Sequence, residues 1–280
     1  TNKKSRTGRA GKVKGRSGAR LNIYIKIDDL QLLKFRLPVM PDLILVELNR
    51  KTFRAFQQQQ KVVKKFQRKL CWCLPPILLE NEMDFFSNAE KKLLNNHSRT
   101  WQIGHVGQQL FFADNKGLNL LGDYPLNILN SQGLYVLNGL NVQRAQASIE
   151  IDRESLKNLL DSRSASVSGV DLGMTVYATP PLFTARSTAS HFIYGQPLLS
   201  PRGEAIILHK AWNGTVALAE NPFSLLPKRK ELATMGLKYA VIDLSRRKVT
   251  KKENEEIARE AAGRRSKRKL STFNYNGSLL

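Results

Sequence analysis

The sequence is poor in cysteine and has no long apolar run. Cys71 and Cys73 are its only cysteines in 280 residues, so they cannot crosslink a secreted fold or supply the four ligands of a structural zinc site. No run approaches the ~18 apolar residues of a membrane-spanning helix, and no signal peptide is recognisable. We expect an intracellular, cytoplasmic protein with no membrane partner and no cofactor.

Common catalytic motifs are absent as well. The chain has no GxSxG elbow, no HExxH zinc pair, no GxxxxGK[ST] phosphate loop and no GxGxxG after a strand, which leaves the corresponding mechanisms without support. Its 41% hydrophobic and 24% charged residues are ordinary for a globular protein. Both cysteines fall on one predicted strand, where we interpret them as buried small hydrophobes.

Acidic residues are scarce relative to basic ones. The chain holds 45 Lys and Arg against 23 Asp and Glu, a net charge of +22. Residues 1–20 carry eight basic residues and no acid, so we predict a disordered basic arm there and a basic tail over 263–280. Such ends either bind RNA or another polyanion or only solubilise and link domains, and the composition leaves both open.

Between these ends, short apolar runs alternate with helical patterns. This alternation is typical of a parallel sheet covered by helices. The predicted strands are 21–27, 42–48, 69–74, 101–105, 118–121, 145–149, 174–178 and 239–243. Eight strand–helix units predict an α/β fold, a (β/α)8 TIM-type barrel over residues 21–262. An open doubly wound sheet is the alternative, because a strand count does not prove closure.

The rhythm breaks after the seventh strand. Residues 180–222 begin with Pro180–Pro181 and carry two strand-like runs on either side of Asn213–Gly214, a strong two-residue turn signal. We therefore predict a β-hairpin insertion between strands 7 and 8 of the barrel.

In a barrel, chemistry belongs at the carboxyl ends of the strands. The polar residues there form a candidate mouth. We predict catalytic roles for Glu150, Arg186, His105 and Asp243, and substrate-binding roles for Asp123, Asn127, Tyr177 and Asn221.

Each candidate also has a structural interpretation. Asp123 suits a turn and Asp243 a strand end before Ser245. Glu150 and Arg186 could pair with each other or clamp a carboxylate or phosphate. Spacing alone does not choose between an ion pair and an anion site.

Six fragments come in an order and spacing that resembles the collagenase-like peptidase family, peptidase family thirty-two. They are Gly122–Ser131, Ala147–Glu150, Pro181–Arg186, Leu199–Glu204, Asn221–Leu226 and Ala240–Asp243. The resemblance covers nearly half the chain well, and residues 21–121 only by strand rhythm. It implies a barrel that either degrades collagen or takes part in oxygen-independent hydroxylation of RNA or a ubiquinone precursor, with an iron–sulfur cluster and prephenate.

The sequence departs from that family where the chemistry should be. No cysteine follows Arg186, and the family's Glu-x-x-x-His-Gly segment reads Met174–Ala178 here. The cluster ligands and the usual histidine are therefore missing. Because the chain starts at Thr1 with a basic arm, we expect a downstream barrel of a larger member, with an upstream catalytic domain as partner.

Two functions of different classes follow. One is a binding module whose positively charged surface binds RNA or another polyanion while the barrel supports a catalytic partner domain. The other is an enzyme, a peptidase or hydroxylation component, with an acid–base site at the barrel mouth.

Overall fold

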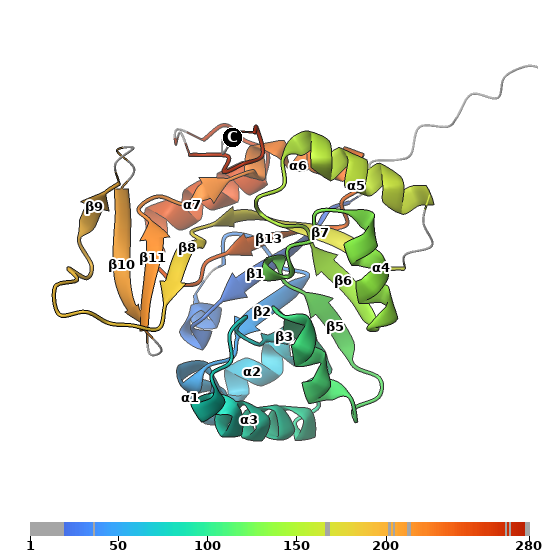
Figure 1. Cartoon of the computed structure of the whole chain (residues 1–280), viewed down its shortest axis with the longest axis vertical. Helices are drawn as coiled ribbons and strands as arrows, with labels where there is room; N and C mark the ends of the chain where they lie inside the picture. Colours follow the sequence, from blue (N-terminus) through green and yellow to red (C-terminus); the bar gives the residue numbers. More distant parts are fainter. Residues whose placement is uncertain are drawn as a thin grey trace, which may run out of the picture.

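Eight parallel strands close into a barrel in the computed structural model, which describes residues 20–277 except 36, 166–168, 201–202, 204, 212–213, 267 and 269 (Figure 1). Closure follows because β6 pairs with both β5 and β7, and β1 pairs with both β2 and β13. The barrel strands are β1 (Asn22–Ile27), β2 (Leu43–Glu47), β3 (Leu70–Cys73), β4 (Thr100–Ile103), β5 (Asn119–Gly122), β6 (Val142–Gln146), β7 (Asp171–Ala178) and β13 (Tyr239–Asp243). The predicted (β/α)8 barrel is confirmed, and the open sheet is wrong.

Helices separate most of the strands and cover the barrel. The α-helices are α1 (Arg50–Gln58), α2 (Gln60–Phe66), α3 (Met83–Asn95), α4 (Ser131–Gly139), α5 (Arg153–Ala165), α6 (Arg229–Met235) and α7 (Lys251–Ala261). Short 3-10 helices are η1 (Leu30–Lys34), η2 (Gln67–Lys69), η3 (Glu80–Glu82), η4 (Val106–Phe112), η5 (Tyr124–Leu126) and η6 (Leu226–Lys228). None of the helices in this described part is long and apolar enough to cross a membrane.

Polar side chains start three of these helices. Asn130 accepts the N–H of Gly133 at 3.1 Å, Asp152 accepts that of Ser155 at 2.9 Å, and Thr250 accepts that of Glu253 at 3.2 Å. Each contact satisfies a backbone donor that has no partner inside its helix.

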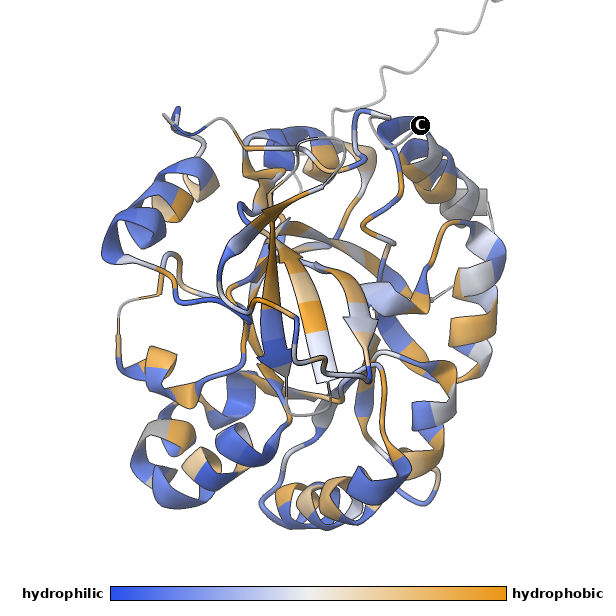
Figure 2. Ribbon diagram, turned by 60° about the vertical axis from the view of Figure 1, so that its left-hand side comes forward, coloured by the Kyte–Doolittle hydropathy of each residue, from blue (hydrophilic) through white to orange (hydrophobic). Residues whose placement is uncertain are grey.

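The core has two parts because strand side chains alternate between the two faces of the sheet. On β3, Trp72 packs outward among the helices, whereas Cys71 and Cys73 point into the barrel. Figure 2 shows the apolar residues concentrated on the barrel strands, with hydrophilic residues over the surrounding helices. Both cysteines are buried and free, as predicted.

A pair of stacked aromatic rings fills the barrel interior toward the amino ends of its strands. Tyr24 and Tyr239 lie 4.4 Å apart between ring centroids, with 20° between their planes. A Cβ on Gly173 would come within 2.3 Å of the Tyr239 ring. Only a residue without a side chain fits β7 at that point.

The sixth strand differs from its prediction. It runs over Val142–Gln146, three residues earlier than the predicted 145–149. Gln146 lies inside the barrel and is completely buried, so the strand presents a polar residue to the barrel interior. Glu150 lies four residues beyond the strand instead of next to it.

The predicted insertion is a small antiparallel sheet between β7 and β13. Its strands, in the order β8-β11-β10-β9, are β8 (Pro181–Ala185), β9 (Pro197–Leu199), β10 (Ala205–Ala211) and β11 (Gly214–Ala219). The strands β10 and β11 form the predicted hairpin, although Asn213 in its turn lies outside the described residues. Figure 1 shows this inserted sheet standing to one side of the barrel. The short β12 (Phe223–Ser224) then pairs with β7.

The chain after α7 packs against the barrel as far as residue 277. Tyr275 is buried, its carbonyl accepts the N–H of Arg153 at 3.0 Å, and the Ser271 carbonyl accepts the N–H of Ser224 at 2.9 Å. Arg268 forms an ion pair with the buried Glu260 at 3.1 Å. This described part of the predicted basic tail is therefore ordered, whereas residues 1–19 of the predicted arm lie outside the described residues.

Candidate active site at the barrel mouth

A buried ion pair lies at the carboxyl end of the barrel. Lys26 on β1 places its Nζ 2.6 Å from Oδ2 of Asp123, which directly follows β5. The two side chains are only 6% and 3% exposed. The pair joins strands on different parts of the barrel wall, and it sets the charge of the barrel interior near the mouth.

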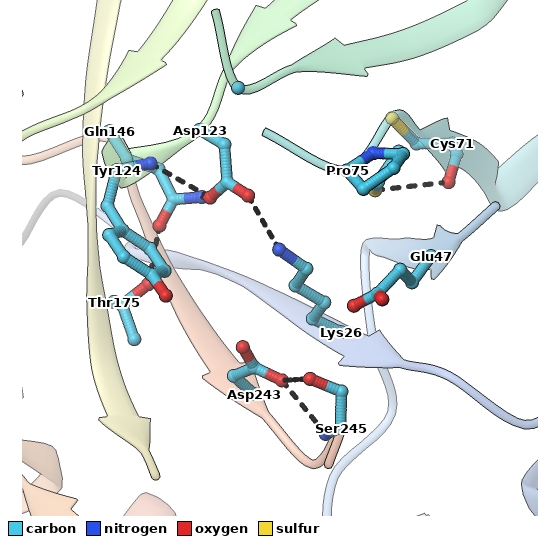
Figure 3. Close-up of polar contacts among 12 residues, drawn as sticks. Lys26, Glu47, Cys71, Pro75, Asp123, Tyr124, Gln146, Thr175, Asp243 and Ser245 are labelled. Atoms are coloured by element: carbon cyan, nitrogen blue, oxygen red, sulfur yellow. Dashed lines mark hydrogen bonds and ion pairs between the residues drawn. The ribbon is translucent and has the colours of Figure 1, made fainter. Parts of the chain in front are cut away.

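A chain of hydrogen bonds orients Asp123. Its Oδ1 accepts the amide of Gln146 at 2.8 Å and the backbone N–H of Tyr124 at 2.8 Å. The Thr175 hydroxyl in turn donates to Gln146 Oε1 at 2.6 Å (Figure 3). Asp123 thus has defined partners, whereas among the described residues it is the only hydrogen-bond partner of the Lys26 ammonium. An ammonium has three donors, so two are left for a ligand or water.

Lys26 keeps its charge. Burial alone would lower the pKa of Lys26, but attraction to Asp123 and Asp243 outweighs burial, and the pKa lies well above its usual value. Asp243 pairs with Lys26 in the sheet, and Figure 3 places it on the side of Lys26 away from Asp123. A protonated amine cannot form a Schiff base, so Lys26 is suited to holding a negatively charged oxygen.

A second cation lies beside two carboxyl groups. Arg246 donates its backbone N–H to Asp28 Oδ2 at 2.9 Å, and its guanidinium lies 3.4 Å from Glu47 Oε2. Its φ of 68° is unusual for a residue with a side chain. The Asp28 contact holds this strained backbone, which turns the guanidinium toward the barrel mouth.

Asp28 has the electrostatic properties of a proton carrier. Burial raises the pKa of Asp28, the negative charges of Glu47 and Asp243 raise it further, and the Arg246 N–H only partly opposes them. A carboxyl group whose pKa moves up toward neutral pH exchanges protons more effectively with a substrate.

These groups line a pocket of about 720 Å³, within the range for small-molecule sites. The barrel contributes its charged floor, and Tyr124 keeps its proton because burial raises its pKa to about 12. The inserted sheet contributes an overhanging wall. The floor residues are Lys26, Asp28, Glu47, Asp123, Tyr124 and Arg246, and the wall residues are Pro181, Thr184, His209, Lys210, Val216 and Leu218.

The structure brings together two of the predicted site residues. Asp123 and Asp243 flank Lys26, and Asp243 also accepts the Ser245 N–H at 2.9 Å. Of the predicted site residues only Asp123 lines the pocket, and Asp243 lies beside Lys26 without lining it. Glu150 and Asn221 are exposed, Asn127 ends η5 in a left-handed conformation, and the exposed His105 caps η4 by accepting the Gly107 N–H. Their predicted roles stay predictions.

Arg186 and Tyr177 are directed elsewhere. Arg186 borders a separate groove with Leu79, Glu80 and Asn81. Tyr177 packs outside the barrel, where its hydroxyl contacts Glu253 and Arg268. An irregularity in the β7–β13 pairing next to Tyr177 explains its direction, because an extra residue on one strand reverses the alternation of side chains.

The sequence contained signals for the residues that were missed. Lys26 and Glu47 are charged residues at inward positions of otherwise apolar strands, and a charge inside such a strand needs a partner or a function. Asp28 follows Lys26 by two residues and keeps the same alternation. Arg246 gave no signal, because its left-handed backbone cannot be read from sequence.

The thiols do not fit the iron–sulfur cluster that the family resemblance implies. The chain has two cysteines, both buried on β3, and burial together with the neighbouring Cys71 raises the pKa of Cys73. A cluster needs four thiolates, so we derive no step through one. Among the described residues, no three His, Cys, Asp or Glu side chains gather in a way that would hold a metal ion.

Sequence comparison finds no matching family model and no matching curated protein. Solved structures do match. The U32 peptidase Mk0906 gives a TM-score of 0.49 at 10% identity, over 86% of this chain and 99% of that one. The protein CutC of Streptococcus agalactiae gives 0.50 at 8% identity, over 79% and 98%. The spore cortex-lytic enzyme SleL of Bacillus cereus gives 0.47 at 8% identity, over 88% and 75%.

The fold is shared. A U32 peptidase is among the structures that resemble this chain, but identities this low show the barrel alone. A barrel hosts many unrelated reactions, so the function has to be argued from the site itself.

Proposed function

We propose that this protein is a hydrolase whose active site is the pocket at the barrel mouth, and that it cleaves an ester or amide bond of an acyl compound. One observation carries the proposal. The buried, charged Lys26 reaches the pocket with a single described hydrogen-bond partner, and the same pocket is lined by Asp28, a carboxyl group whose pKa burial raises. A fixed cation and a proton carrier are the two elements that acyl hydrolysis requires.

The mechanism assigns a role to each residue. Water attacks the carbonyl carbon while the Asp28 carboxylate takes its proton. The carbonyl oxygen becomes an oxyanion that the Lys26 ammonium stabilises. Collapse of the tetrahedral intermediate breaks the bond to the leaving group, which receives the proton from Asp28, and a carboxylic acid product remains. Asp123 and Glu47 act as positioning residues for Lys26 and Arg246.

Acyl esters and anilides test the proposal. Asp28→Asn is expected to lower kcat/KM by about 10²- to 10⁴-fold, and Lys26→Met combined with Asp123→Asn by at least about 10²-fold. The matched control is Glu154→Gln, which changes an exposed carboxyl on α5. Loss of activity in Glu150→Gln but not in Asp28→Asn would restore the sequence-based assignment and refute this one.

The peptide-bond version of this reaction agrees with the family resemblance. Release of peptides from denatured collagen, lost in Asp28→Asn, is the expected result if peptides are the substrate. Hydrolysis of simple esters without any cleavage of collagen keeps the hydrolase but rejects that substrate.

A second candidate function, binding of RNA or another polyanion, is favoured by a basic surface. Residues 50–69 contain Arg50, Lys51, Arg54, Lys61, Lys64, Lys65, Arg68 and Lys69 and no acidic residue. Arg50 and Lys51 pair with Glu82 and Asp29. Five of the others are exposed along α1, α2 and η2, namely Arg54, Lys61, Lys64, Lys65 and Arg68.

A salt series with structured RNA tests this binding. Affinity should fall steeply between low and physiological salt, and replacing Lys61, Lys64 and Lys65 by Glu should flatten the slope by about one unit for each phosphate contact removed. Equal replacement of the exposed Lys251 and Lys252 on α7 is the control. Affinity that hardly depends on salt would reject phosphate binding. Participation in RNA hydroxylation with an upstream domain would require this binding first.

A further inference from the structure

The pocket has two unlike halves, and their arrangement bears on the substrate of the proposed hydrolase. The floor is charged, as described above. Above it, Pro76 and Ile77 follow β3, and Phe85 lies on α3. Ile77 is 45% exposed, a large apolar side chain facing open space. Phe85 is half-buried, with its ring against Phe53 and Phe86 and 4.7 Å from the Arg50 guanidinium. On this side the pocket therefore offers an apolar surface made of the exposed Ile77 and part of Phe85.

The inserted sheet supplies the opposite apolar surface. In its ladder, His209 pairs with Val216, Ile207 pairs with Leu218, and Thr184 pairs with Val216. Paired residues share one face of a sheet, and the face alternates along each strand. Of these residues, Thr184, His209, Val216 and Leu218 line the pocket, whereas Phe183 pairs with Ala217 at an alternate position and is 50% exposed.

We propose that the substrate is an amphipathic acyl compound, in which an aliphatic or aromatic acyl chain lies between Ile77 and Phe85 on one side and Val216 and Leu218 on the other. The reacting carbonyl then lies at Lys26. This inference rests on the proposed function and adds the identity of the acyl group. The product of hydrolysis is a carboxylate with an apolar chain, which places its charge on the Lys26 floor and its chain in the upper half.

The charged residues that line the pocket set the sign of the ligand. The carboxylates of Asp123 and Glu82 are held by Lys26 and Arg50, and Asp28 and Glu47 both contact Arg246. Lys26 has donors left over, and Lys210 lines the pocket without a described ion pair. Over the whole lining, five cations outnumber four carboxylates, so the pocket favours an anionic head group over a cationic one. The cations are Lys26, Arg50, Lys51, Lys210 and Arg246, and the carboxylates are those of Asp28, Glu47, Glu82 and Asp123.

Calorimetric binding of straight-chain carboxylates tests the inference without any reaction. From butyrate to hexanoate to octanoate, affinity is expected to rise about fourfold per methylene, the ratio that corresponds to ~0.8 kcal/mol. Hexylamine is expected to bind at least about tenfold more weakly than hexanoate. Equal affinities along the series, or an amine that binds as well as the acid, would overturn the inference.

Matched variants test where the acyl chain of the ligand lies. Val216→Thr with Leu218→Thr should weaken octanoate binding about tenfold and leave acetate unchanged. Phe183→Thr, on the other face of the same sheet, should leave both unchanged. Equal loss in the Phe183 variant would overturn the placement. If affinity rises with chain length but no ester or anilide is hydrolysed, the proposed hydrolase is rejected and the proposed ligand class is kept. If substrates are hydrolysed but affinity does not depend on chain length, only the proposed ligand class is rejected.

Discussion

Replacing Lys26 by methionine removes the cation from a buried pair and leaves the shape nearly unchanged. With side chains 6% and 3% exposed, Lys26 and Asp123 form no surface pair, for which about 0–1 kcal/mol would be lost. Breaking a buried pair costs about 3–5 kcal/mol, because the remaining charge is uncompensated. Asp123 keeps the Gln146 and Tyr124 donors, so we expect the lower end of the range, about 3 kcal/mol.

A double variant distinguishes this cause from a packing defect. Adding Asp123→Asn removes the orphaned charge and should recover most of the loss, to within about 1 kcal/mol of the parent protein.

Urea denaturation gives the free energy of unfolding for each variant. The control is Lys51→Met, whose pair with Asp29 has side chains 68% and 28% exposed and should cost at most about 1 kcal/mol. The reasoning is refuted if Lys26→Met costs no more than this control, or if the double variant is no more stable than the single one.

Three further variants probe other parts of the structure. Asp28→Asn should be more stable than the parent protein at pH 7, because burial raises the pKa of Asp28 and its ionised form therefore opposes folding. The urea unfolding curves of the two proteins should converge at a pH below ordinary carboxyl pKa values, and a stability advantage of the variant that persists there contradicts this. Gly173→Ala should lower the free energy of unfolding by about 1–3 kcal/mol, because the added methyl group overpacks Tyr239. An unchanged midpoint of urea unfolding would contradict this and would mean that the Tyr239 ring moves freely. Tyr275→Ala should lose about 3–5 kcal/mol in the same assay because the ring is buried. Tyr275→Phe keeps the ring and loses the hydroxyl contacts with Glu231 at 3.3 Å and Met235 Sδ at 4.0 Å, so it should lose about 1 kcal/mol; equal losses in the two variants would contradict this.

The barrel could be predicted because its strands obey one rule. A strand buried on both faces is apolar over most of its length, and Leu43–Glu47 and Tyr239–Asp243 meet this condition up to the acidic residue that ends each run. The insertion was predictable from the prolines and the turn that interrupt the rhythm. The sixth strand was misplaced because its inward Gln146 bonds to Asp123 and Thr175, and such a network is visible only once the barrel is closed.

The candidate site was harder to predict than the fold. Asp123 and Asp243 were found because they follow strands directly. Lys26 lies at an inward position of an apolar strand, where a buried lysine requires a partner, but the sequence does not show which residue that partner is. The direction of Tyr177 depends on a local irregularity in strand pairing. Arg246 depends on a left-handed backbone. Neither feature has a sequence signal.

A crystal structure of the protein with bound hexanoate tests the central claim most directly. The account predicts a carboxylate oxygen within hydrogen-bond distance of Lys26 Nζ and the alkyl chain against Val216 and Leu218. A carboxylate bound elsewhere, or a Lys26 ammonium whose remaining donors are taken by other protein groups, would contradict it.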